Sequence, residues 1–389
     1  MAKFSVFLLI LFFISGINVR LTAQIVCGAD QPEKYLPLLQ KKRVGLVVNH
    51  TSLKGNAHLV DFLKSEKINV KRIFAPEHGF RGEASAGEEI KGGIDKRTGI
   101  QVVSLYGKNK KPTEKNLKDL DALIYDIQDV GCRFYTYIST LHLVIEACAE
   151  NNIPLLILDR PNPNGDYVAG PVLKPEFVSF VGMDPIPIVH GCTVGELALM
   201  INGENWTTAK TKCKIDIIPV LNYSHSTKYE PPVPPSPNLP NYISIRLYPS
   251  ICFFEATKVS LGRGTEFPFQ VLGGLDSTLG NFRFTPVDIP GVAIDPVNEG
   301  QVCYGVDLRT LSEVPEFTLS YFLDFYRKFR YESDFIDREN WFNLLAGTDV
   351  LLAKIRGGNT ESDILKVFEP ELETYKTMRK KYLLYPDFE

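Results

Sequence analysis

The chain has 389 residues, of which 44% are apolar, and it carries 43 Lys and Arg against 46 Asp and Glu, a formal net charge of −3. The length suggests two domains, and the apolar content is ordinary for a globular protein with a sizeable core. The nearly balanced charge lacks the basic footprint of a nucleic-acid-binding protein, so we expect no nucleic-acid partner.

Residues 1–23 have the pattern of a secretory signal peptide. Lys3 gives a short positive start, and the run from Phe4 to Ile14 is almost wholly apolar. We therefore expect an exported protein, periplasmic or secreted, with no stable membrane insertion after signal cleavage. A minor alternative is a lipoprotein anchored at Cys27, although two bulky residues precede that cysteine.

The first half of the chain alternates between strand-like and helix-like segments. Short apolar runs typical of buried parallel strands recur at 43–49, 70–75, 101–106, 122–125 and 154–158. Apolar residues at helical spacing occur at 56–67 and 136–152. This alternation predicts an α/β fold with a Rossmann-like, mainly parallel sheet and flanking helices, which we place at residues 24–190.

The chain after residue 190 is less regular, and we expect a smaller α+β auxiliary domain over residues 191–389 that closes a cleft. Thr193, with Glu196 three positions later, predicts a capped helix. A strand is expected at 214–220, strands and turns at 248–264 and 271–283, and helices at 319–329 and 363–381. Pro370 is expected to divide the last helix.

A proline-rich segment lies in the middle of this second half. Residues 229–240 contain six prolines in twelve positions, which excludes a helix or a central strand. Two interpretations stay open: a mobile linker, or an extended segment fixed along a cleft.

Polar side chains follow each of the five predicted strands of the first half. In chain order they are Asn49; Glu77 and His78; Tyr106; Asp126, Gln128 and Asp129; and Asp159, Arg160 and Asn162. The carboxyl ends of parallel strands share one edge, and ligands of open α/β sheets bind outside that edge. The alternative is simple strand termination by polar residues.

Several common site motifs are missing from the sequence. No Gly-x-Gly-x-x-Gly follows the first strand, so dinucleotide binding is not predicted, and no Gly-x-Ser-x-Gly elbow supports an ester or amide hydrolase. The six histidines are scattered and no Cys-x-x-Cys occurs, so we expect no metal site and no cofactor.

The densest cluster of reactive side chains follows the second strand. Within 74–88 stand Glu77, His78, Arg81 and Glu88, with glycines between them. Cleavage of a glycosidic bond needs one carboxyl that donates a proton and a second that stays ionised. Glu77 follows Pro76 directly at the strand exit and is the best candidate for the general acid, with Asp126 and Glu88 as further catalytic candidates.

Sequence segments in order along most of the chain resemble one enzyme family. They are Pro76-Glu-His-Gly-Phe-Arg-Gly82 with Ala86-Gly-Glu88, Tyr125-Asp-Ile-Gln-Asp-Val-Gly-Cys-Arg-Phe-Tyr-Thr-Tyr137, Asp159-Arg-Pro-Asn-Pro163, Gly170-Pro171, His190-Gly191, Tyr248-Pro-Ser250, and Gly262-Arg-Gly-Thr265 with Pro268-Phe269. This set resembles the NamZ-type exo-β-N-acetylmuramidases.

The resemblance implies both a fold and an activity. It implies a Rossmann-like domain, a smaller auxiliary domain and a cleft between them. It also implies release of terminal N-acetylmuramic acid from the non-reducing end of peptidoglycan fragments, with Glu77 as the leading catalytic residue. Muramyl saccharides are then the expected partners. The alternative is a non-catalytic periplasmic protein that binds muropeptides or sugars.

A site for N-acetylmuramic acid must recognise the lactyl carboxylate that glucosamine lacks. An arginine fork suits that task, and the candidates are Arg81, Arg133, Arg160 and Arg263, each with a structural ion pair as the alternative. Sugars also pack on flat apolar faces, for which Tyr135 and Tyr137 are candidates. The predicted binding set is completed by Asn49, His78, Asp129 and Asn162.

Overall fold

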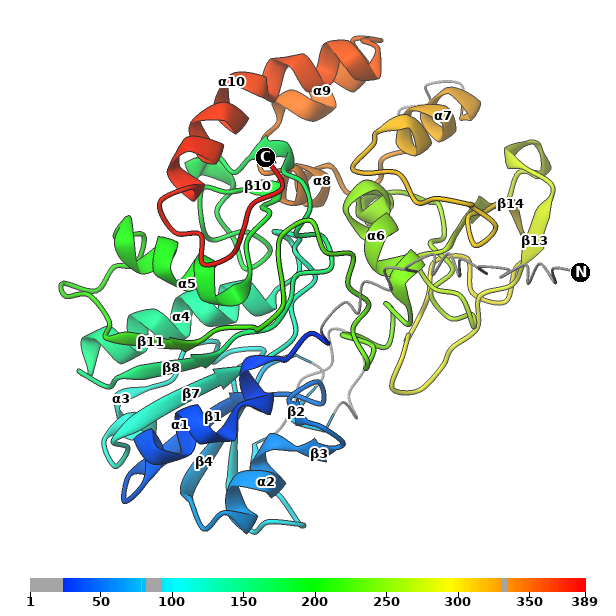
Figure 1. The fold of residues 1–389 in the computed structure, drawn as a ribbon. Coiled ribbons are helices and arrows are strands. Elements are labelled where there is room, and N and C mark those ends of the chain that lie inside the picture. Colours follow the sequence, from blue (N-terminus) through cyan, green and yellow to red (C-terminus); the bar gives the residue numbers. More distant parts are fainter. Residues whose placement is uncertain (1–23, 78, 82–91, 330–334) are drawn as a thin grey trace, which may run out of the picture.

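The protein is described by a computed structural model that covers residues 24–77, 79–81, 92–329 and 335–389. The predicted signal peptide and the candidates His78 and Glu88 lie outside the described residues. Figure 1 shows a sheet-centred unit, blue to green, beside a smaller unit that carries β13, β14, α6 and α7. Within the described ranges, no helix has both the length and the apolar character needed to cross a membrane.

The larger unit is built on a seven-stranded sheet with the order β11-β8-β7-β1-β4-β6-β5. The strands are β1 Arg43–Val48, β4 Asn69–Ala75, β5 Gly93–Ile94, β6 Gln101–Ser104, β7 Ala122–Asp126, β8 Leu155–Leu158 and β11 Ile215–Ile218. All neighbours pair in parallel except β5 with β6. Without β5, this is the Rossmann strand order, and the predicted fold class is confirmed.

Helices cover both faces of this sheet because its central strands are apolar on both sides. Val44, Leu46 and Val48 of β1 pack on one face with α1 Pro32–Leu39 and α2 Leu59–Ser65. Val47 packs on the opposite face, where α3 Glu114–Leu117, α4 Tyr137–Glu150 and α5 Val194–Gly203 contribute to the core. Burial of each such side chain contributes about 1.5–3 kcal/mol.

The sheet-centred unit extends beyond residue 190, where we expected the boundary. Strand β11 pairs with β8 at the sheet edge, and α5 packs against α4. Both elements lie in the range that we assigned to the auxiliary domain. They belong to the first unit because their apolar faces complete its core.

The smaller unit contains a three-stranded antiparallel sheet in the order β12-β14-β13. Its strands are β12 Val271–Gly274, β13 Phe282–Phe284 and β14 Cys303–Asp307. The helices after residue 240 are α6 Tyr242–Ile251, α7 Ser320–Lys328, α8 Glu339–Ala346, α9 Val350–Arg356 and α10 Glu361–Arg379. One apolar core runs from α4 and α5 through α6 to α9, so the two units share their interior.

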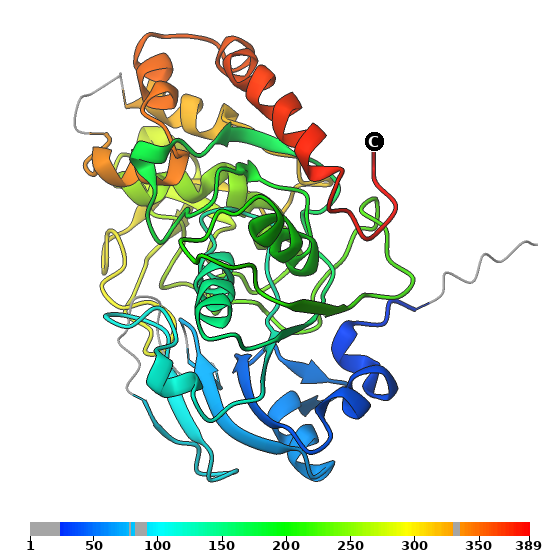
Figure 2. The same cartoon turned by 90° about the vertical axis from the view of Figure 1, so that its left-hand side faces the viewer.

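Short elements complete the chain. The ribbons are β2 Leu53–Lys54 with β3 Ala57–His58, and β9 Ala169–Val172 with β10 Pro187–Val189. The 3-10 turns are η1 Gly28–Asp30, η2 Pro175–Phe177, η3 Cys252–Ala256 and η4 Ser277–Leu279. Helix α10 packs beside β9, as Figure 2 shows at the top of the molecule.

Two expectations about the second half of the chain were wrong. Helix α10 continues through Pro370, which we expected to divide it. The first residues of the segment 248–264, where we expected strands and turns, instead form the end of helix α6, which contains Pro249. Because Pro249 has no N–H, it leaves the carbonyl of Ile245 without its helical donor. Asn164 Nδ2, from the loop after β8, donates to that carbonyl at 3.1 Å and replaces the lost bond.

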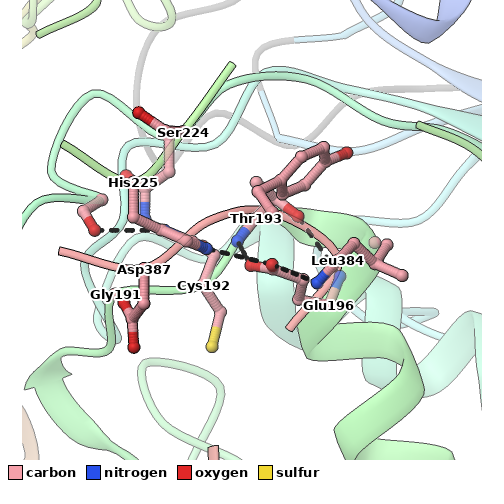
Figure 3. A network of polar contacts seen from close by, with 12 residues as sticks. Gly191, Cys192, Thr193, Glu196, Ser224, His225, Leu384 and Asp387 are labelled. Carbon is pink, nitrogen blue, oxygen red and sulfur yellow. Dashed lines mark hydrogen bonds and ion pairs between the residues drawn. The ribbon is translucent and has the colours of Figure 1, made fainter. Parts of the chain in front are cut away.

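The C-terminal segment is hydrogen-bonded to the start of α5 (Figure 3). Thr193 caps this helix as predicted, because its N–H donates to Glu196 Oε2 at 2.8 Å and its hydroxyl accepts from the Glu196 N–H. The other carboxylate oxygen of Glu196 accepts the Leu384 N–H at 2.8 Å and lies 3.0 Å from His225 Nε2. A buried carboxylate therefore joins three distant segments of the chain.

Candidate active site

A pocket lies between the carboxyl end of β4 and the smaller unit. It is lined by Glu77, Phe134, Tyr135, Thr136, Tyr137, Ser236, Asn238, Leu239, Tyr248, Glu255, Arg263 and Phe269. Its cavity volume of about 90 Å³ is well below the roughly 300–1,000 Å³ usual for ligand sites. The pocket can therefore enclose only part of one sugar, and the rest of a larger ligand must extend outward.

Glu77 reaches this pocket from the end of β4, as the parallel-sheet prediction required. Its Oε2 atom accepts a 2.9 Å hydrogen bond from Thr136 Oγ1, at the start of α4. Burial, together with the charge of Glu77 and a hydrogen bond to it, raises the pKa of Tyr106, which therefore stays a neutral donor. The half-buried Glu77 carboxyl is thus oriented by groups from two other segments.

Aromatic side chains form the apolar part of the pocket. The predicted pair, Tyr135 and Tyr137, meets edge to face with ring centroids 4.9 Å apart. Tyr248 and Phe269 of the smaller unit meet similarly at 5.2 Å. Phe269 has a φ of +55°, which is rare for a bulky residue. Such strained backbone conformations occur most often at functional sites. These rings form the apolar lining of the pocket, and Tyr137 and Phe269 are each only 2% exposed.

The proline-rich segment is a fixed wall of the pocket. Tyr135 donates its hydroxyl to the carbonyl of Pro235 at 2.7 Å, and His50 Nε2 lies 2.8 Å from the carbonyl of Pro234. On the other side, Asn238 Nδ2 donates to the carbonyl of Val292 at 2.9 Å. Of the two open interpretations, the structure supports a segment held along a cleft, but the segment bends and makes a turn at 236–239 instead of staying extended.

Arg263 faces the pocket, as predicted for one of the four arginine candidates. Its Nη1 atom lies 3.1 Å from Glu255 Oε1, in η3. Arg263 stands in a turn between Gly262 and Gly264, whose φ angles are +72° and +78°. A Cβ atom on Gly264 would lie 2.4 Å from the carbonyl oxygen of Val287, so only glycine fits there.

Glu255 was missed by the sequence analysis. It lies between two segments that resemble the family, Tyr248-Pro-Ser250 and Gly262-Arg-Gly-Thr265, but no local motif marks it. Its position in the pocket depends on how η3 packs against α6 and α8. The proximity of those two segments was the only sequence signal for it.

Asp126 and Arg160 do not line the pocket, contrary to our expectation. The Asp126 carboxylate is fully buried and pairs with Arg160 through both oxygens, at 2.5 and 3.0 Å. Burial raises the pKa of Asp126, and the guanidinium opposes that rise. Arg160 also donates to the carbonyl of Leu53 at 2.9 Å, so the pair joins the ends of β7 and β8 to the segment that follows β1.

Two other predicted arginines also have structural partners. Arg133 is fully buried and donates to the carbonyls of Pro171, Ile186 and Leu345 at 2.8–2.9 Å. Arg81 forms two 3.0 Å bonds to Asp95, which lowers the pKa of that carboxyl to about 2 against the opposing effect of burial. Neither guanidinium lines the pocket: Arg81 has the structural ion pair given as its alternative, whereas the partners of Arg133 are backbone carbonyls and not an Asp or Glu.

The predicted polar residues Asn49, Asp129 and Asn162 are buried beneath the edge of the sheet. Asn49 Oδ1 accepts from the Thr51 N–H at 2.9 Å, Asp129 Oδ2 accepts from the Gly131 N–H at 2.6 Å, and Asn162 Nδ2 donates to the Cys192 carbonyl at 2.8 Å. These bonds shape the loops around the site. Among the described residues, no group of three or more His, Cys, Asp and Glu side chains could hold a metal ion.

Comparisons with known proteins agree with this arrangement. The N-terminal model of the exo-β-N-acetylmuramidase NamZ matches residues 44–243, and the C-terminal model matches residues 246–385. Peptidoglycan β-N-acetylmuramidase NamZ of Bacillus subtilis strain 168 is 38% identical over 375 residues, which cover 90% of this chain and 89% of that protein.

Two solved structures share the fold. A DUF1343 family protein from Bacteroides fragilis is 47% identical, with a TM-score of 0.87, and the match covers 94% of this chain and all of that one. A second DUF1343 family protein from the same species is 28% identical, with a TM-score of 0.79, over 93% of this chain and 99% of that one. Because both family models match in succession across most of its length, this chain belongs to the NamZ exo-β-N-acetylmuramidase family and is a glycoside hydrolase.

Proposed function

We propose that this protein releases single N-acetylmuramic acid residues from the non-reducing end of peptidoglycan fragments, with Glu77 as the general acid. The observation that carries the proposal is the position of Glu77, on the rim of the sheet and inside a pocket too small for more than one sugar. The proline-rich wall limits the pocket on one side, which supports attack at chain ends. The B. subtilis relative is named a peptidoglycan β-N-acetylmuramidase, in agreement with this substrate.

In the proposed reaction, Glu77 gives its proton to the glycosidic oxygen while the bond from that oxygen to C1 breaks. A water molecule supplies the new oxygen on C1, and a second carboxylate takes up the charge or the proton on that side. The sum is addition of one water to the glycoside. Thr136, which donates to Oε2 at 2.9 Å, keeps the Glu77 carboxyl turned in one direction.

Arg263 is the residue that we propose to bind the lactyl carboxylate. Among the described residues that line the pocket, it is the one with a permanent positive charge. Its guanidinium side chain is 30% exposed, so donors remain on the pocket side after it pairs with Glu255. A planar fork matches a carboxylate in geometry and charge.

We also propose that the protein acts outside the cytoplasm, where peptidoglycan is accessible. The support is the sequence pattern of residues 1–23. The thiol of Cys27 is buried, at 8% exposure, in the folded chain, which favours the form without a lipid anchor.

The test compares wild type with Glu77→Gln on a chromogenic β-muramide and on two disaccharides. Wild type should release N-acetylmuramic acid from MurNAc–GlcNAc, in which it is the non-reducing sugar, and should leave GlcNAc–MurNAc intact. Glu77→Gln should lower kcat by at least 100-fold with an unchanged circular dichroism spectrum. Full activity in this variant would exclude Glu77 from the mechanism, and cleavage of both disaccharides would overturn selectivity for N-acetylmuramic acid as the non-reducing sugar.

A further inference from the structure

We propose that Glu255 is the second carboxylate of the reaction. This inference rests on the proposed function, in which Glu77 is the general acid. The two carboxyls line the same pocket but come from different units: Glu77 follows β4 of the sheet, and Glu255 lies in η3 of the smaller unit. A glycosidase needs carboxyls on both sides of the bond that it cleaves.

The other predicted partner that the structure describes is engaged elsewhere. Asp126 is fully buried and forms a two-point ion pair with Arg160. Within the described ranges, Glu77 and Glu255 are the two acidic side chains that line the pocket. Glu255 therefore has the place that sequence reasoning gave to Asp126.

The contacts of Glu255 hold its side chain in place and still leave it accessible to water and substrate, as a catalytic carboxylate requires. Arg263 holds Oε1 at 3.1 Å, and among the described residues no hydrogen bond engages Oε2. Arg338 donates to the backbone carbonyl of Glu255 and so fixes the turn that carries it. The Glu255 side chain is 21% exposed, so water and substrate can reach it.

The Arg263–Glu255 pair also links recognition to chemistry. In N-acetylmuramic acid, the lactyl ether is on C3, two ring bonds from the reacting C1. Arg263 can bind the lactyl carboxylate with one edge of its guanidinium while its Nη1 atom stays paired with Glu255. This arrangement brings the Glu255 carboxylate to the C1 side of the same sugar ring. A substrate without the lactyl group would lose that alignment.

Two forms of the step satisfy this placement and balance in atoms. If water attacks C1 directly, Glu255 takes one proton from that water while Glu77 gives its own to the leaving oxygen. If Glu255 itself bonds to C1, water later breaks that bond, and Glu77 takes the proton of the water. In both forms the net change is one water added, and Glu255 faces C1.

The test is chemical rescue of Glu255→Ala, with the exposed acid Glu313 changed to Ala as a matched control in the same unit. We expect Glu255→Ala to lower kcat on the chromogenic muramide by at least 100-fold, with KM within about threefold of wild type. Sodium azide or formate should restore part of the rate, and azide should yield a glycosyl azide detectable by mass spectrometry. Glu313→Ala should match wild type.

Two results would overturn the inference. One is a Glu255→Ala kcat within tenfold of wild type. The other is a folded, inactive variant that neither azide nor formate restores, which would mean that Glu255 only holds Arg263. An inactive wild type would instead reject the proposed function, so the two failures are distinguishable.

Discussion

The hydroxyl of Thr136 donates a 2.9 Å hydrogen bond to Glu77 Oε2 and thereby joins the residue that begins α4 to the carboxyl that follows β4. Both residues belong to the sheet-centred unit. The orientation of Glu77 is therefore set within one unit, whereas Glu255 and Arg263 line the pocket from the other.

Removal of the Thr136 hydroxyl should slow catalysis without weakening binding. Glu77 becomes negatively charged as it gives up its proton in the transition state, and a hydrogen bond to a charged group contributes about 1.5–3 kcal/mol, so Thr136→Val should lower kcat by roughly 10- to 100-fold. KM should change little. Thr136→Ser, which keeps the hydroxyl, is the matched control and should stay near wild type. Equal rates for Val and Ser at this position would show that the bond does not orient Glu77 for catalysis.

Arg263 should discriminate between a charged and a neutral lactyl group. Arg263→Lys keeps the charge but loses the planar fork, and we expect it to lower kcat/KM for a muramide by about tenfold or more. The same glycoside with its lactyl carboxylate amidated is the control substrate, for which the loss should be much smaller. An equal loss for both substrates would contradict recognition of the carboxylate by Arg263.

The Asp126–Arg160 pair should matter for stability rather than for chemistry. Arg160→Met leaves a buried carboxylate without its partner, which should lower the free energy of unfolding by about 3–5 kcal/mol. The double variant Asp126→Leu/Arg160→Met removes both charges and should recover most of that loss. Urea denaturation measures both effects, and folded enzyme should keep its kcat. A single variant as stable as wild type would refute the structural role.

His58 should make the protein less stable in acid. Burial lowers its pKa from the ordinary 6.5 to about 4, although its bond to the carbonyl of Asn49 opposes that shift. Below pH 6.5 the unfolded chain therefore binds a proton on this histidine that the native state does not bind. The free energy of unfolding is highest above pH 6.5 and falls by about 3 kcal/mol as the pH drops towards 4.

The check is urea denaturation of wild type and His58→Asn at pH 7 and at pH 4. Asparagine can replace His58 as the cap that accepts the Val60 N–H, but it does not titrate. The stability advantage of wild type over the variant should shrink by about 3 kcal/mol between the two pH values. A constant difference would mean that His58 takes up its proton equally in both states.

Short-range patterns in the sequence determined much of the fold. Runs such as 43–49 and 154–158 became β1 and β8, and the spacing of Thr193 and Glu196 became the cap of α5. Glu77 was also placed correctly, because a residue directly after a parallel strand has only one edge of the sheet on which to emerge. Periodicity, capping and strand exits depend on neighbours within a few positions, which the sequence displays.

Long-range packing determines which polar groups are free to act, and the sequence does not display it. Arg133 was a binding candidate until its guanidinium was seen to reach the carbonyl of Leu345, 212 positions away, and Glu255 had no local mark at all. Whether a charge is desolvated and paired or left facing a pocket depends on contacts between segments far apart in the chain. Those contacts form when the two units close over a common core, so no local pattern of residues records them.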